Sequence, residues 1–261
     1  MYFNYEQILK APPYYTHQQK GTSIMERLDK ILSSQGICTR KEARKLAGDK
    51  KITVNGITIR KTDIKVDPDN DIIEVGGKRV EYKKYVYIMM NKPKGVLSAS
   101  TDRNAQTVID LLPEEYKRNG LFPAGRLDRD TTGLIIITDD GDFAHRMLAP
   151  KKHVPKLYKA TLDAPITDSD KQILEQGMTL RDGTKYSPAK VKTTNGCIVE
   201  IEISEGKFHQ VKNMFAFVGK TVENLERLRI GGLFLDKKLS HGECRYLNNS
   251  EITAIFNSDN Y

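Results

Sequence analysis

The stretch FPAGRLDRDTTGLIIITDDGD, residues 122–142, places acidic side chains on both sides of an apolar run. A turn-rich loop carries Asp128 and Asp130 and leads directly into residues 134–138, which are predicted to form a buried strand. A carboxylate at the edge of a buried strand can serve as a nucleophile or as a general base. An aspartate in such a loop is more often a turn or cap residue. The loop by itself therefore does not decide whether Asp128 is catalytic or structural.

Several other patterns that define a chemistry are missing from the sequence. It contains no GxxxxGK[ST], GxSxG or HExxH motif and no strand–GxGxxG–helix unit. Residues 139–142, DDGD, lack the spacing of a calcium loop and are predicted to be a turn and helix cap. Cys38, Cys197 and Cys244 are isolated, which disfavours a disulfide framework or a zinc site and is typical of a reducing cytoplasm. The sequence therefore indicates no metal and no cofactor.

The elements that position the loop are predicted from hydrophobic periodicity. Strands are expected over residues 86–90, 134–138, 158–162, 197–203 and 222–230. Helices are expected over residues 142–148, 169–176 (after a cap pattern at Thr167) and 208–218. In the last helix an apolar set is expected to pack inward, namely Phe208, Val211, Met214, Phe215 and Val218. The strands do not alternate strictly with helices, so we predict an α+β fold with a mixed, largely antiparallel sheet.

The net charge points to a polyanionic partner and is unevenly distributed. The 261 residues include 42 Lys and Arg against 34 Asp and Glu, a formal net charge of +8. Residues 25–61 hold ten Lys and Arg against four acids, a net of +6, so most of the excess lies in one short segment. No apolar run approaches the roughly 20 residues that cross a bilayer, which excludes a membrane-spanning protein.

The basic segment is predicted to be a small module of two helices and a hairpin. Thr39 and Glu42 have the spacing of a capping box, which begins the second helix. Asn55-Gly56 between two β-branched runs is the strongest short signal of a hairpin. We expect the module over residues 25–75, a linker over 76–85 and a larger domain over 86–261. Residues 1–24 differ in composition and are expected to be a disordered leader or extension.

The segments MERLDKIL, TRKEARKLA and KITVNG of this module resemble the S4 RNA-binding domain. The resemblance implies that its surface docks on structured RNA, with affinity from phosphate contacts. The residues implied in RNA binding are Arg27, Lys30, Arg40, Lys41, Arg44, Lys45, Lys50 and Asn55. The alternative is that these charges form an ordinary solvated surface.

The larger domain carries a series of long motifs in a fixed order: MNKPKGV, GRLDRDTTGL with TDDGDFAHR, KLYKATL, EGKFHQVKNMFAFVG and LRIGGLFLDKKLSHGECRYL. Together these segments resemble the RsuA-type pseudouridine synthases. Within the family, HQVK, DRDTTGL and RIGGLFLD are most similar to the branch acting on small-subunit (16S) ribosomal RNA.

The resemblance implies a site in which three residues are catalytic. Asp128 would be the reacting carboxylate, Lys212 the cation that keeps it ionised, and Tyr158 the ring that stacks on the target base. Residues implied in substrate binding are Arg126, Leu127, His209 and Gln210. Asp130 is predicted to be loop scaffolding. Asn213 stands where relatives commonly carry arginine, which should weaken RNA affinity more than chemistry.

These observations predict a cytoplasmic, monomeric enzyme that isomerises a uridine of small-subunit rRNA without cofactor or metal. Its partner would be ribosomal RNA, either free or in an assembling small-subunit particle, and no membrane. Two alternatives remain: a large-subunit (23S) rRNA synthase of the same family, and a non-catalytic S4-domain protein of ribosome assembly.

Overall fold

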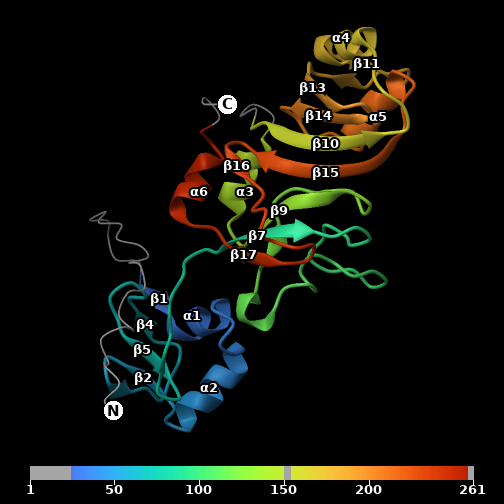
Figure 1. Cartoon of the computed structure of the whole chain (residues 1–261). Coiled ribbons are helices and arrows are strands. Elements are labelled where there is room, and N and C mark those ends of the chain that lie inside the picture. Colours follow the sequence, from blue (N-terminus) through green and yellow to red (C-terminus); the bar gives the residue numbers. More distant parts are fainter. Residues whose placement is uncertain (1–24, 150–153, 258–261) are drawn as a thin grey trace, which may run out of the picture. The chain divides into compact units, whose positions relative to one another are not determined.

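The computed structural model describes residues 25–149 and 154–257 (Figure 1). The leader predicted for residues 1–24 lies outside these ranges. The described chain forms two compact units, residues 25–32 with 39–82 and residues 33–38 with 83–257. Helices and strands occur in both units, which confirms the predicted α+β class. Within the described part of the chain, no helix has the length and apolar composition of a membrane span.

The first unit contains the predicted helices and hairpin. Its helices are α1 (Leu28–Ser34) and α2 (Arg40–Gly48), and α2 begins at a capping box in which Thr39 and Glu42 exchange hydrogen bonds. The Asn55-Gly56 turn joins β2 (Ile52–Val54) to β3 (Ile57–Thr58), and both turn residues have positive φ. The cap and the turn are confirmed because each depends on residues that are close in sequence.

The first unit also contains strands that the sequence did not predict. They are β1 (Glu26–Arg27), β4 (Lys65–Val66), β5 (Ile73–Val75) and β6 (Lys78–Arg79). One sheet has the order β3-β2-β5-β6, and β1 pairs with β4. Strands of two or three residues are too short to show alternation, and β6 falls inside the segment predicted as a linker.

The second unit is built on a mixed sheet in which β10 and β15 run side by side (Figure 1). The order of its path is β13-β14-β10-β15-β9-β7-β17, with β16 on β15 and β8 on β9. All pairs are antiparallel except β9 with β15, so the prediction of a largely antiparallel sheet is confirmed. The bounds are β7 (Tyr87–Lys92), β8 (Phe122–Pro123), β9 (Thr132–Thr138), β10 (Lys156–Leu162), β13 (Lys190–Asn195), β14 (Ile198–Ile203), β15 (Val222–Ile230), β16 (Leu233–Phe234) and β17 (Cys244–Tyr246). A separate pair joins β11 (Met178–Thr179) to β12 (Lys185–Tyr186).

Strand β9 lies between two hydrophobic cores. Its Ile135 and Ile137 belong to one buried cluster, and Leu134 and Ile136 belong to the other. Because side chains alternate along a strand, an uninterrupted apolar run is the pattern of a strand covered on both faces. The loop before β9 is therefore attached to a strand that is buried on both faces.

The helices of the second unit cover these two faces. Buried residues of α3 (Gly141–Leu148) join one cluster, and those of α4 (Asp168–Gln176) and α5 (Gln210–Phe217) join the other. The other helices among the described residues of this unit are η2 (Glu114–Tyr116), a 3-10 turn, and α6 (Asn249–Ala254). Asp140 caps α3 by accepting from the Phe143 N–H (3.0 Å), and Thr167 forms a capping box with Asp170, as predicted.

Candidate active site

The loop that carries Asp128 is fixed through its main chain. Ser98 Oγ donates to the carbonyl oxygen of Leu127 (2.9 Å) and accepts from the Leu127 N–H (3.0 Å). The N–H of Thr131 donates to the carbonyl oxygen of Asp128 (3.1 Å) and closes a turn. Leu127 itself is buried in the core, so its side chain anchors the loop. Asp128 thus stands on a loop held at both ends.

The buried side chain of Lys92 donates hydrogen bonds to the main chain of this loop. Its Nζ donates to the main-chain carbonyls of Thr131 (2.9 Å), Pro93 (3.0 Å) and Arg129 (3.3 Å). The Lys92 side chain is 0% exposed, and burial lowers its pKa to about 8 against the opposing effect of the loop's two aspartates. Sequence reasoning assigned no role to Lys92, although it lies in the MNKPKGV segment. Two of its partners, Arg129 and Thr131, are some 40 residues away and become neighbours only through the pairing of β7 with β9.

Asp128, Asp130, Lys212 and His209 form one charged cluster. Lys212 Nζ lies 2.6 Å from Asp130 Oδ1 and 3.5 Å from Asp128 Oδ2, so it bridges both carboxylates. His209 Nε2 lies 3.5 Å from Asp128 Oδ1. The hydrogen bond from Lys212 holds the pKa of Asp130 below its ordinary value. The sequence predicted a pair of Lys212 with Asp128 and did not foresee that Asp130 would take the shorter contact.

Tyr158 lies in the core with a buried arginine beside it. Its side chain is largely buried on β10, and Arg227 Nη1 donates to its hydroxyl oxygen (3.4 Å). The Arg227 Nε also donates to the carbonyl oxygen of Leu134 (2.7 Å), which fixes the guanidinium between β15 and β9. Sequence reasoning missed Arg227. The alternation of VENLERLRI would have placed it on the same face as the buried Leu225.

The segment before α5 differs from the prediction. Helix α5 begins at Gln210, and His209 before it has a left-handed φ of 49°. Phe208, predicted to pack inward, is instead 79% exposed and stacks on the His209 ring. The inward prediction is wrong for Phe208 because the left-handed residue breaks the helical periodicity. It holds for Val211 and Met214, which are buried.

Gln210 and Asn213 fix this segment by side-chain hydrogen bonds. Gln210 is buried, accepts from the Lys207 N–H (3.0 Å) and donates to Glu205 Oε1 (2.8 Å). Asn213 Nδ2 donates to the Tyr186 hydroxyl (2.9 Å) and to the carbonyl oxygen of Phe208 (3.3 Å). Both amides therefore support the loop that presents His209.

The exposed residues predicted to contact RNA lie on several elements. Arg126 is exposed next to the Asp128 loop. In the first unit, α2 buries Ala43 and Ala47 and leaves its four basic side chains exposed: Arg40, Lys41, Arg44 and Lys45.

The other predicted residues of that unit already have local partners or turn roles. Arg27 pairs with Asp29 (2.8 Å) and Lys30 with Glu26 (2.8 Å). Lys50 is exposed in a left-handed turn. The Asn55 side-chain amide donates to Asp71 Oδ1 (2.8 Å) and accepts from the Ile72 N–H (2.9 Å), which ties the hairpin to the segment before β5.

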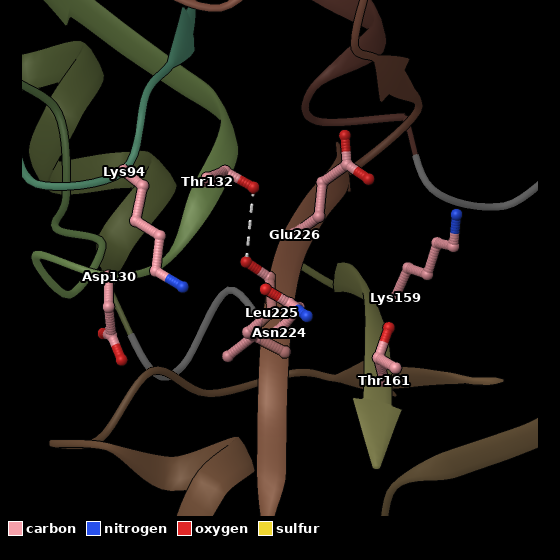
Figure 2. A pocket seen from close by; sticks show the side chains of 8 residues that line it. All are labelled: Lys94, Asp130, Thr132, Lys159, Thr161, Asn224, Leu225 and Glu226. Atoms are coloured by element: carbon pink, nitrogen blue, oxygen red, sulfur yellow. Dashed lines mark hydrogen bonds between the residues drawn. The ribbon is translucent and has the colours of Figure 1, made fainter. Parts of the chain in front are cut away.

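A polar pocket of about 230 Å³ adjoins the charged cluster and shares Asp130 with it (Figure 2). Figure 2 shows Lys94 and Asp130 on one side, Lys159 and Thr161 of β10 on the other, and residues of β15 between them. The full lining is Lys94, Asp130, Thr132, Lys159, Thr161, Asn224, Leu225 and Glu226. The pocket offers ammonium, hydroxyl, amide and carboxylate groups, which suit a polar ligand.

The charged cluster contains the groups needed for a reaction in which one carboxylate acts as nucleophile or base. Asp128 is partly exposed, faces a lysine and a histidine, and stands on a loop held by main-chain hydrogen bonds. A positioned carboxylate of this kind can attack carbon or remove a proton. Among the described residues, no group of three His, Cys, Asp or Glu side chains could hold a metal ion.

Comparison with known proteins defines the class to which this fold and site belong. Residues 86–217 match the RNA pseudouridylate synthase family, and residues 26–73 match the S4 domain. The chain is a member of the RNA pseudouridine synthase family with an N-terminal S4 domain.

Individual relatives cover nearly the whole chain. The uncharacterized RNA pseudouridine synthase YtzG of Bacillus subtilis is 44% identical over 88% of this chain and 98% of that protein. Ribosomal small subunit pseudouridine synthase A of Escherichia coli is 38% identical over 88% of this chain and 99% of that protein. A crystal structure of a pseudouridylate synthase superimposes with a TM-score of 0.62 at 34% identity, covering 88% of this chain and 99% of that one.

Proposed function

We propose that this enzyme isomerises one uridine of 16S ribosomal RNA to pseudouridine, with Asp128 as the reacting carboxylate. The observation that carries the proposal is the position of Asp128, 3.5 Å from both Lys212 Nζ and His209 Nε2 on a loop clamped by Lys92.

The reaction breaks the C1′–N1 glycosidic bond and forms a C1′–C5 bond after the uracil turns. The proton on C5 is lost and N1 gains one, so no electrons are exchanged and no water is consumed. Asp128 can serve this isomerisation by attacking C1′, by attacking the base, or by removing a sugar proton. Each route requires one ionised carboxylate at the sugar and base, which is what the cluster supplies.

The residues around Asp128 take supporting roles in this proposal. Tyr158, oriented by the buried Arg227, stacks on the target uracil and assists the later proton transfer. A uridine inside folded RNA must leave its stack, and the exposed Arg126 occupies the vacated place. Leu127 and His209 line the position of the target, while the buried Gln210 acts through the loop.

The proposed partner is ribosomal RNA, bound by the S4 unit and the catalytic unit of one monomer in the cytoplasm. The exposed cations of α2 would supply phosphate contacts without reading sequence. The choice of 16S RNA rests on similarity to proteins named ribosomal small subunit pseudouridine synthase A. Free RNA and an assembling small-subunit particle are both compatible with this surface.

Tritium release from [5-³H]uridine-labelled RNA tests the proposal directly. The wild type should release label from 16S transcripts or small-subunit particles, and Asp128→Ala and Asp128→Asn should release none above background. Unchanged melting temperatures of these variants would show that the fold is intact. Equal release by wild type and Asp128→Ala would refute the catalytic assignment.

The substrates also separate the alternatives. Release from 23S RNA alone would identify a large-subunit enzyme, and RNA binding without any release would identify a non-catalytic protein. Mapping pseudouridines in rRNA from a strain lacking the gene would then locate the modified uridine.

A further inference from the structure

Phe208 is an exposed aromatic ring at the edge of the charged cluster. Its side chain is 79% exposed, more than any other large apolar side chain among the described residues. The ring stacks on the His209 imidazole, with centroids 3.8 Å apart and planes 20° from parallel. His209 covers one face of the ring, and so much exposure leaves the opposite face in water.

The backbone holds this ring in one place. His209 has a φ of 49°, an uncommon conformation for a residue with a side chain, and such strain persists only where surrounding contacts enforce it. Asn213 Nδ2 donates to the Phe208 carbonyl oxygen (3.3 Å), and the Asn213 N–H donates to the His209 carbonyl oxygen (2.9 Å). The ring is therefore presented on a preorganised support rather than on a free loop.

The support connects the ring to the proposed reacting group. His209, which stacks under Phe208, places its Nε2 3.5 Å from Asp128 Oδ1. Lys212, one turn along, contributes a positive charge on the same side. An aromatic face next to lysine is the combination with which proteins hold unpaired nucleotides, because every base offers a π-face and every nucleotide a phosphate.

We propose that Phe208 is a stacking platform for the base of a nucleotide adjacent to the uridine that reacts at Asp128. The inference rests on the proposed function. A uridine that leaves its stack exposes a face of its neighbour, and the free face of Phe208 would cover it. Tyr158 is already assigned to the target uracil, so the neighbouring base needs a different ring. Phe208 is thus a positioning residue that contributes to binding rather than to the chemical step.

Steady-state tritium release on a short RNA that contains the mapped uridine tests this role. Loss of one base–aromatic stack should raise KM about 5- to 100-fold in Phe208→Ala. The kcat should change less than about threefold, because Asp128 and Lys212 remain in place. Phe208→Tyr and Phe208→Trp should restore KM, whereas Phe208→Leu, apolar but without a π-face, should resemble alanine.

Phe217, 47% exposed at the end of α5, provides a matched control. Phe217→Ala should keep the wild-type KM, and melting temperatures should match for all variants of Phe208. A wild-type KM in Phe208→Ala, or full rescue by leucine, would overturn the stacking role. A protein-contact role for Phe208 would give that same wild-type KM on protein-free RNA.

An abasic nucleotide placed on either side of the uridine identifies the partner base. One of the two substitutions should raise KM for the wild type by the same factor as Phe208→Ala, and should add nothing in that variant. Equal, additive losses in wild type and Phe208→Ala would contradict the pairing. Absence of release by the wild type would count against the proposed function, whereas an active wild type indistinguishable from Phe208→Ala would refute only this inference.

Discussion

Lys212 Nζ lies 2.6 Å from Asp130 Oδ1, so the carboxylate nearest to this lysine is not the one proposed to react. Asp128 shares the same ammonium at 3.5 Å. One cation therefore serves two carboxylates on a single loop, and the shorter pair anchors Lys212 at the mouth of the site. Asp130 is the more exposed of the two carboxylates. A substitution of Asp130 therefore tests how far this residue orients Lys212, while Asp128 stays in place.

Asp130→Asn should remain active. The substitution removes the charge that competes for Lys212, and the lysine can then approach Asp128, so kcat should stay within about tenfold of wild type. Lys212→Met should lower kcat about 100-fold or more, because a preorganised charge at a reacting group is worth that much. Single-turnover tritium release measures both, and Lys212→Arg is the matched control expected to keep the charge. If Asp130→Asn abolished turnover while Asp128→Asn did not, Asp130 would be the reacting carboxylate.

Lys92→Met should impair catalysis although Lys92 itself is buried and does not contact the substrate. The substitution leaves three main-chain carbonyls of the loop region without their donor, and an unsatisfied buried carbonyl costs about 1–3 kcal/mol. The loop that carries Asp128 would reorganise, and kcat should fall while RNA affinity measured by filter binding stays unchanged. A variant with wild-type kcat would show that the clamp is not needed.

The same lysine should make stability depend on pH in a defined direction. The pKa of Lys92 in the fold is about 8 against an ordinary 10.5, so the unfolded chain binds more protons between these values. The favourable contribution of Lys92 to the free energy of unfolding is therefore fully present at a pH above the ordinary pKa of 10.5, and it is lost as the pH falls toward 8. The stability difference between wild type and Lys92→Met should grow by about 2 kcal/mol from pH 7.5 to pH 10 in urea unfolding. A difference that shrinks with rising pH would contradict the assigned direction of the shift.

Gly133→Ala should destabilise the junction between β9 and β15. A Cβ at Gly133 would lie 2.4 Å from the Arg227 carbonyl oxygen, and the φ of 98° disfavours any side chain. We expect a loss of about 2–4 kcal/mol in thermal or urea unfolding. Gly141→Ala is the control, because a Cβ there meets nothing within 4 Å and alanine suits a helix, so stability should be unchanged or slightly higher.

Neutral substitutions on α2 should weaken RNA binding and flatten its salt dependence. If Arg40, Lys41 and Arg44 each contact a phosphate, every glutamine substitution should lower the slope of log K against log salt by about 0.7–0.9. Lys171→Gln, on α4 beside Glu175, is the control and should leave the slope unchanged. An unchanged slope for the α2 variants would mean that this face is only solvated surface.

Local patterns explain which elements could be predicted from the sequence. The capping boxes at Thr39 and Thr167 and the Asn55-Gly56 turn depend on contacts within a few residues, and all three are present. Strand β15 matches its predicted range, residues 222–230. Phe208 shows the limit of periodicity, since one left-handed residue at His209 turned a predicted core residue outward.

The α+β class, the family and the identity of the candidate residues all follow from the sequence alone, since motif order and hydrophobic period are properties of the chain. Which of these charged side chains contact one another depends on the tertiary structure. Lys92 reaches the Asp128 loop because β7 pairs with β9, and Lys212 reaches both aspartates because α5 packs against the sheet. Contacts between residues 40 to 80 positions apart depend on register and packing, which a local pattern does not encode. For that reason the exposed Phe208 and the bridging Lys212 became visible only in the fold.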